Sequence, residues 1–157
     1  MPEDGWTLPP EIRARVSSPN NPLKARAREL GLTMVERERI PSPRRAHECT
    51  EYARTHGRLE PFHAALLRAY WSEGKDLHDW DVLGAAAQQA SLDADDMRSE
   101  VESGALRDAV DERIRGAQEL GIHAVPTFLV ADRIVIQGAQ SLDVFRRAMQ
   151  QLGVKPR

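Results

Sequence analysis

The sequence predicts a mostly helical α/β protein that ends in a β-hairpin and a helix. Three observations favour this class. Apolar residues recur at steps of three and four between residues 42 and 121, which is the spacing of amphipathic helices. Two short runs rich in β-branched residues follow, at residues 124–131 and 134–136. The last stretch, from Ser141, returns to helical spacing.

The composition indicates one globular domain without a strong overall charge. The chain has 157 residues, 41% of them hydrophobic and 29% charged, with a net charge of −2. Its basic residues are spread along the chain, so we expect neither a nucleic acid nor a membrane as partner. Its first residues lack a basic segment followed by an apolar one, which favours a cytoplasmic location. The single cysteine, Cys49, leaves no pair for a disulfide or a structural zinc, and we expect no metal or bound cofactor.

Residues 1–41 are predicted to form an irregular arm with short helices, because prolines are frequent there. A helix is expected over residues 22–30, with Asn21 as its N-cap and Pro22 at its first position. Residues 34–40 alternate imperfectly, and they predict either a short strand or an exposed loop.

A helical segment is predicted over residues 42–121. Its expected helices cover about residues 42–56, 60–71, 80–90, 93–104 and 106–120. In the second of these, Phe62 and Tyr70 lie at core spacing, and Leu67 and Trp71 broaden the apolar face. We therefore expect all four side chains to pack in the core. Cys49 lies in the middle of a helix, where a buried, unreactive thiol is the expected state.

The C-terminal residues 122–157 are predicted to form two strands and a helix. Residues 131–133 make the turn of the hairpin, Gly138 ends the second strand, and Ser141 is expected to cap the last helix.

An ordered set of segments in this chain resembles the DsbA-like oxidoreductase family. The segments are 8–10, 20–24, 46–47, 62–70, 121–128 with Val125-Pro126-Thr127, and Gly138-Ala139-Gln140-Ser141. They are most similar to the FrnE-type and 2-hydroxychromene-2-carboxylate isomerase branch, and they cover nearly the whole chain. The resemblance implies a thioredoxin-like fold of the DsbA type, with residues 42–121 as a large helical insertion.

The resemblance also implies a substrate-binding site at Ala124, Val125, Pro126 and Thr127. Only about 5–6% of X-Pro bonds in folded proteins are cis, so the residues alone favour an ordinary trans proline that opens an edge strand. The family implies instead a cis bond at Pro126, which forms a rigid wall beside the redox site, and it makes Thr127 the start of the strand. The backbone of Val125 would then pair with an extended peptide or with glutathione as substrate.

The reactive segment of the family has no counterpart in this sequence. In the family, a C-x-x-C motif, or a serine in its place, opens the helix that follows the first strand. Here the resemblance begins after the second strand, which implies that the first βαβ unit is missing and that no residue serves as nucleophile. Three explanations stay open: a longer chain that starts upstream, a homodimer in which a second copy covers the exposed strand edge, or a remnant in which residues 34–40 fill the gap.

Three functions are consistent with this reading. The first is a thiol–disulfide oxidoreductase-like protein, or the C-terminal part of one, that binds peptide or glutathione thiols and is inactive alone. The second is a non-catalytic binding or assembly module that keeps only the substrate-binding loop. The third is a glutathione-dependent isomerase-like protein.

Overall fold

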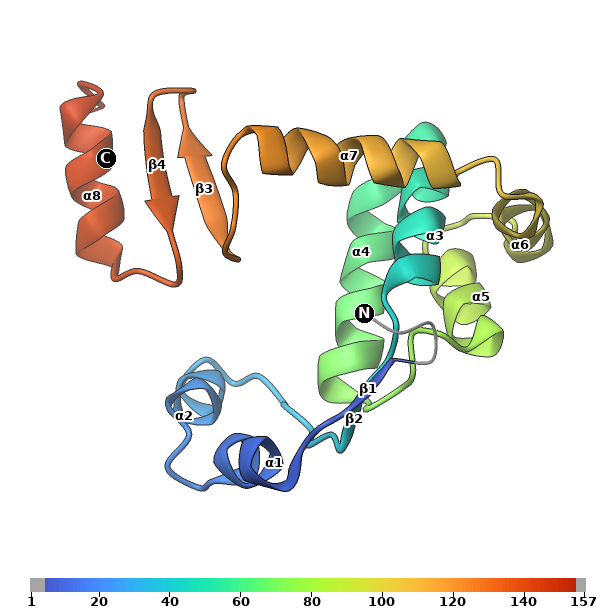
Figure 1. Cartoon of the computed structure of the whole chain (residues 1–157), viewed down its shortest axis with the longest axis horizontal. Helices are drawn as coiled ribbons and strands as arrows, with labels where there is room; N and C mark the ends of the chain where they lie inside the picture. Colours follow the sequence, from blue (N-terminus) through green and yellow to red (C-terminus); the bar gives the residue numbers. More distant parts are fainter. Residues whose placement is uncertain (1–4, 155–157) are drawn as a thin grey trace. The chain divides into compact units, whose positions relative to one another are not determined.

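The computed structural model describes residues 5–154, and the chain divides into two compact units (Figure 1). The first unit comprises residues 1–110 and the second comprises residues 111–157.

The first unit begins with a two-stranded ribbon and two short helices. Strand β1 (Trp6–Thr7) pairs antiparallel with β2 (Arg39–Ile40), and helices α1 (Pro10–Ser17) and α2 (Pro22–Glu29) lie between them in the sequence. Of the segment 34–40, only the last two residues are a strand, because only these find a partner strand.

Helix α2 begins as the sequence predicts. The side chain of Asn21 accepts a hydrogen bond from the backbone N–H of Leu23 at 2.9 Å, and Pro22 is the first helical residue. At the other end, the N–H of Leu32 donates to the carbonyl of Ala27 at 2.8 Å, and this bond holds the segment that leaves the helix.

The rest of the first unit is helical. Its elements are α3 (Arg44–Thr55), α4 (Leu59–Leu67), the π-helix η1 (Arg68–Ser72), α5 (Trp80–Gln89), α6 (Ala94–Ser103) and α7 (Arg107–Glu119), the last of which continues into the second unit. The predicted helices are confirmed, with their ends displaced by no more than two residues. None of the helices within residues 5–154 has the length and apolar character required to cross a membrane.

The core of the first unit lies among α3, α4, α5 and α6. Its fully buried large side chains are Tyr52, Phe62, Leu83, Met97 and Cys49. The hydroxyl of Tyr52 donates to a carboxylate oxygen of Asp96 at 2.6 Å, so the buried phenol keeps a partner. The predicted burial of Phe62 and Cys49 is confirmed, and burial of a side chain such as Phe62 contributes about 1.5–3 kcal/mol.

The predicted core positions of Leu67 and Trp71 are wrong. Leu67 is 45% exposed and Trp71 is 41% exposed. Directly after Leu67 the helix changes from α to π geometry, and the N–H of Glu73 donates to the carbonyl of Arg68, five residues earlier. Leu67 and Trp71 follow the exposed His63 at steps of four, so the three side chains form one stripe beside the buried stripe of the helix. Tyr70 is half-buried, with the guanidinium of Arg37 3.8 Å from its ring centre.

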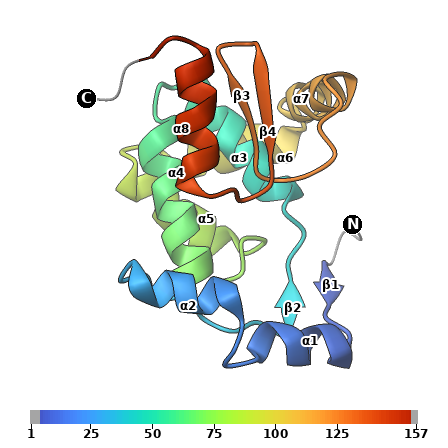
Figure 2. The ribbon, with the colours of Figure 1, turned by 90° about the vertical axis from the view of Figure 1, so that its left-hand side faces the viewer.

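The second unit contains a hairpin and one helix, as predicted. Strand β3 (Thr127–Val130) pairs antiparallel with β4 (Ile134–Gln137), and α8 (Leu142–Gln151) runs alongside this hairpin (Figures 1 and 2). Ala131 and Asp132 adopt φ angles of 51° and 53°, the left-handed conformation of a tight hairpin turn.

One prediction for the second unit needs correction. Ser141 stands at the N-cap position of α8, but its side chain makes no capping hydrogen bond. The mostly helical architecture with a C-terminal hairpin and helix is otherwise confirmed. The predicted three-part division into residues 1–41, 42–121 and 122–157 stays a prediction.

Candidate functional site

The candidate site is the loop that enters β3. The peptide bond between Val125 and Pro126 is cis. Ala124, Val125 and Pro126 are exposed, and the residue Val125 keeps 90% of its surface accessible to solvent, whereas Thr127 is half-buried. A fully exposed valine at the start of a strand is unusual for a side chain that prefers burial.

Two hydrogen bonds fix this loop to the hairpin. The hydroxyl of Thr127 donates to the carbonyl of Ala124 at 2.6 Å. The N–H of Gly138 donates to the carbonyl of Pro126 at 2.7 Å, which ties the loop to the residue after β4. The polypeptide on both sides of Val125 is therefore held in place.

Gly138 is a site residue that the sequence reasoning did not identify. Its φ angle of 78° lies in the region that glycine adopts without strain, and this conformation directs its N–H toward the proline loop. The signal in the sequence is the Gly138-Ala139-Gln140 segment, which predicted the end of a strand but did not indicate the contact with Pro126.

The backbone of Val125 is free. Across residues 5–154, no hydrogen bond is formed by its N–H or its C=O. A backbone donor and acceptor that are exposed and unpaired are the groups with which an extended peptide adds to a strand.

The strand that follows Val125, β3, also has one edge without a partner strand in the described part of the chain. The sheet has only the two strands β3 and β4, so within the described residues the second edge of β3 has no partner strand. Two-stranded hairpins are at best marginally stable alone, and an open edge readily accepts another strand.

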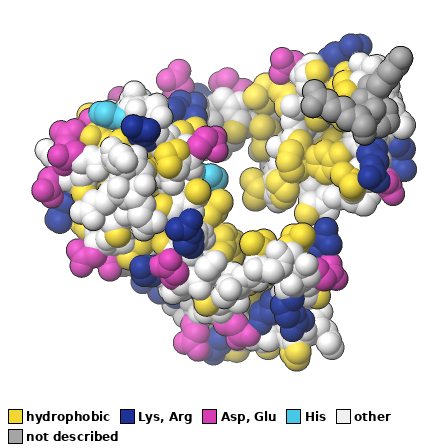
Figure 3. All heavy atoms as spheres, turned by 180° about the vertical axis from the view of Figure 1, so that it is seen from behind, with side chains coloured by type: hydrophobic (Ala, Val, Ile, Leu, Met, Phe, Trp, Pro, Cys, Tyr) yellow, Lys and Arg dark blue, Asp and Glu magenta, His cyan; other side chains and the backbone are white. Residues whose placement is uncertain are grey.

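The two faces of the hairpin differ in how well they are covered. Phe128 contacts Phe145 of α8 edge-to-face at 4.9 Å, and Ile136, opposite Phe128, is buried. On the other face, the cross-strand pair of Leu129 and Val135 is 49% and 59% exposed. Hydrophobic side chains gather over the surface of this unit, at the upper right of Figure 3. One face of the hairpin is thus partly packed against α8, with Phe128 still 40% exposed, and the other face is more open.

Cys49, the only cysteine of the sequence, lies in the interior of the first unit. Its side chain is fully buried in the middle of α3, away from any helix N-terminus. Burial, together with the neighbouring negative charge of Glu48, raises the pKa of the Cys49 thiol to about 12. The thiolate is the nucleophilic form of cysteine, so this thiol is unreactive at neutral pH.

No arrangement for a metal ion is found in the described part of the chain. Residues 5–154 contain no group of three or more histidine, cysteine, aspartate or glutamate side chains placed to hold one. The loop itself presents the backbone groups and the exposed apolar side chain of Val125.

These features define a thioredoxin-type domain with a proline loop before the penultimate strand. The sequence profile of the DSBA-like thioredoxin domain matches residues 11–150. The chain therefore belongs to the DSBA-like thioredoxin domain family, and the predicted family and fold are confirmed.

Two relatives illustrate this membership. YwbO of Bacillus subtilis (strain 168), an uncharacterised protein, is 30% identical over 105 residues, which cover 66% of this chain and 52% of the relative. The crystal structure of a probable DsbA oxidoreductase from Streptomyces coelicolor superposes with a TM-score of 0.77 at 28% identity, over 87% of this chain and 60% of the other. The chain thus spans about half the length of the curated relative and 60% of the solved chain.

Proposed function

We propose that this chain is the substrate-binding part of a DsbA-type thiol–disulfide oxidoreductase. It binds an extended peptide, or glutathione, against the backbone of residues 124–127. The observation that carries the proposal is the exposed Val125, whose N–H and C=O are unpaired at the entrance to a strand with an open edge.

The fixed geometry of the loop supports this binding mode. Because Thr127 holds the carbonyl of Ala124 and Gly138 holds the carbonyl of Pro126, little conformational freedom is lost when a ligand pairs with Val125. Backbone pairing places few demands on the side chains of the ligand, which suits a site that takes many thiol-bearing peptides.

We further propose that the chain by itself does not catalyse thiol–disulfide exchange. Its only cysteine is buried, and burial raises the pKa of that thiol to about 12. In the proposed enzyme, a strand–helix–strand segment with C-x-x-C, outside the present sequence, supplies the thiolate and pairs with β3. The resemblance to the FrnE-type branch and the partial coverage of both relatives support this assignment.

A binding experiment with a matched pair of variants tests the site. S-methylglutathione, which cannot exchange disulfides, is titrated into the ¹⁵N-labelled chain, and we expect amide shifts at Ala124, Val125, Thr127 and Gly138. Val125→Pro removes the N–H and should abolish the shifts, whereas Val125→Ala keeps the backbone and should retain them. Circular dichroism establishes that both variants are folded. Shifts that persist in Val125→Pro, or that lie outside the loop, would contradict the proposal.

A second experiment tests the catalytic part. This chain should not accelerate the reduction of insulin by dithiothreitol, and robust turnover would show that it carries its own nucleophile. Translation of the DNA upstream of Met1 separates the alternatives. An in-frame strand followed by C-x-x-C supports the oxidoreductase, and a serine in that place supports the glutathione-dependent isomerase-like protein.

The alternative function is a non-catalytic binding or assembly module. The open edge of β3 and the exposed Leu129–Val135 face favour it, because both are surfaces that a second copy could cover. A stop codon or unrelated sequence upstream, together with a concentration-dependent dimer in sedimentation, would support this module. The cytoplasmic location and the absence of nucleic-acid and membrane partners stay predictions.

A further inference from the structure

A second candidate site lies wholly in the first unit, apart from the proline loop. A pocket of about 490 Å³ opens between α2 and the segment formed by the end of α4 and η1. Its volume falls within the range of about 300–1,000 Å³ that is typical of small-molecule sites.

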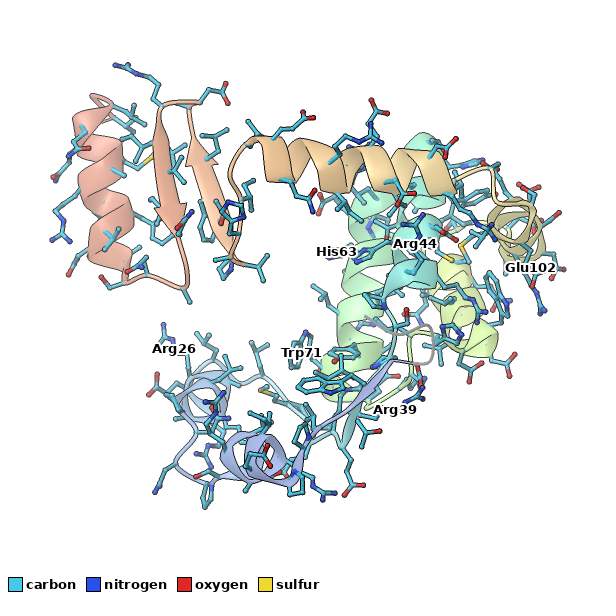
Figure 4. All side chains as sticks on the ribbon, in the orientation of Figure 1. Arg26, Arg39, Arg44, His63, Trp71 and Glu102 are labelled. Carbon is cyan, nitrogen blue, oxygen red and sulfur yellow. The ribbon has the colours of Figure 1, made fainter. Side chains whose placement is uncertain are left out.

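Apolar side chains that the fold leaves exposed form the walls of this pocket. On the α2 side these are Leu23, Leu30 and Leu32, which are 56%, 56% and 60% exposed, and no residue of α2 is buried. Leu67 and Trp71 contribute from the other side. Figure 4 shows Trp71 projecting from the end of the α4–η1 segment toward α2, and Figure 3 shows hydrophobic side chains along the adjacent margin of the α2 region.

The walls are tied together by hydrogen bonds to backbone carbonyl groups. The N–H of Val35 donates to the carbonyl of Trp71 at 2.9 Å, and the hydroxyl of Ser72 donates to the carbonyl of Thr33 at 3.3 Å. Arg37 strengthens the same junction, because it donates to the carbonyls of Tyr70 and Lys75. The pocket is thus formed before any ligand enters. One of its walls is a π-helix, a geometry that often marks functional sites.

The charge at the rim is positive. Arg26 and Arg68 line the pocket, and no aspartate or glutamate does. Arg26 is paired with Glu29 at 2.8 Å, but both side chains are exposed, and such pairs are weak and exchange readily. Arg68 forms no ion pair among the described residues, and its hydrogen bond to the side chain of Gln89 is long, at 3.5 Å.

From this combination, we infer that the pocket binds an amphipathic carboxylate. The apolar body of the ligand lies between the leucines of α2 and Trp71, and its carboxylate pairs with the guanidinium of Arg68. Arg26 adds a second positive charge at the rim. The guanidinium–carboxylate pair is directional and charge-assisted, which gives the site its preference for the acid over a neutral or cationic ligand of the same length.

Three probes of equal chain length test the inference on the full chain. Decanoate, decanol and decyltrimethylammonium are titrated below their micellar concentrations, with affinity measured by calorimetry and position by ¹⁵N amide shifts. We expect decanoate to bind most tightly, with shifts at Ala27, Leu32 and Ser72. The amides of Ala124, Val125 and Thr127 should not shift, so failure of this inference is distinguishable from failure of the proline-loop proposal.

Exposed-site variants identify the charge partner. Arg68→Gln should weaken the affinity for decanoate by about two- to fivefold, the usual effect of losing an exposed ion pair, and leave the affinity for decanol unchanged. Arg68→Lys should recover most of the affinity. Arg115→Gln, on the exposed surface of α7, is the matched control and should have no effect.

Several results would overturn the inference. They are the absence of decanoate binding, equal affinity for decanol and decanoate, and an unchanged affinity in Arg68→Gln. A fourth is a chain that sediments as a dimer which Leu32→Ser converts to a monomer, because the pocket wall would then be a contact between two copies.

Discussion

The two units of this protein differ in how much apolar surface they bury by themselves. The first unit encloses Tyr52, Phe62, Leu83 and Met97 completely. In the described part of the second unit, by contrast, Ile136 and Ala148 are the only buried residues, and each is still 6% exposed.

This difference shows which of the two units covers its own apolar surface. Four helices cover the core of the first unit on all sides, whereas the hairpin of the second unit is covered by α8 on one face. Burial of apolar surface is the main favourable term in folding. A ligand or an added strand should therefore stabilise the second unit more than the first. The proline loop, residues 124–127, lies on the unit whose apolar surface is less well covered.

The largest expected effect concerns the core of the first unit. Phe62→Ala should lower the free energy of unfolding by about 3–5 kcal/mol, because it leaves a large cavity. Leu129→Ala, on the open face of the hairpin, should cost less than about 1 kcal/mol. Urea denaturation followed by circular dichroism compares the two. Equal losses would show that Leu129 is packed in solution and would remove the contrast between the units.

The next effect is a dependence of stability on alkaline pH. The pKa of Cys49 is raised to about 12 in the folded state, against about 8.5 in an unfolded chain. The unfolded state therefore releases its proton first, and the contribution of the buried thiol is complete below about pH 8.5 and is lost as the pH rises toward 12.

Cys49→Ala isolates this contribution. The difference in unfolding free energy between the wild type and Cys49→Ala should fall by up to about 1.4 kcal/mol per pH unit above pH 8.5. Denaturation curves recorded from pH 7 to pH 10.5 measure it. A difference that does not change with pH would mean that the thiol is solvated and would weaken the description of the first unit as closed.

A smaller loss of stability is expected when a helix cap is removed. Asp93 accepts hydrogen bonds from the N–H groups of Asp95 and Asp96, both at 2.9 Å, at the start of α6. Asp93→Ala should therefore cost about 1 kcal/mol. Ser141→Ala should have little effect, since the Ser141 side chain makes no cap at α8. A comparable loss in Ser141→Ala, measured by thermal unfolding, would mean that the serine caps α8 in solution.

The smallest effect is expected within the second unit. The edge-to-face pair of Phe128 and Phe145 should show a coupling energy of about 0.5–1.5 kcal/mol in a double-mutant cycle to leucine. A coupling near zero would indicate that α8 does not hold the hairpin and that the second unit is even less self-sufficient than its packing implies.

Local chemistry made much of the fold predictable. Asn21 and Pro22 marked the start of α2 because capping is a property of adjacent residues. The hairpin followed from two β-branched runs, and the burial of Cys49 and Phe62 from regular helical spacing. Each of these features depends on residues within a few positions of one another.

The wrong predictions concern features that depend on irregular structure or on contacts between residues that are far apart in the sequence. Leu67 and Trp71 lie just beside the buried stripe of the helix, and apolar spacing alone does not define how wide that stripe is. Residues 34–40 form little strand because only Arg39 and Ile40 meet the partner strand β1. In the candidate site, the link from Gly138 to Pro126 joins residues twelve positions apart and depends on the register of the hairpin.

The exposure of Trp71 has a practical consequence for spectroscopy. The chain has three tryptophans, and the guanidinium groups of Arg45 and Arg98 lie over the ring of Trp80, at 4.7 and 5.1 Å from its centre. Trp6 and Trp71 are 42% and 41% exposed, and of the three tryptophans only Trp71 lines the pocket. In the Trp6→Phe variant, the fluorescence should therefore move to shorter wavelengths when an apolar molecule covers the indole of Trp71, and this shift reports binding without an attached dye.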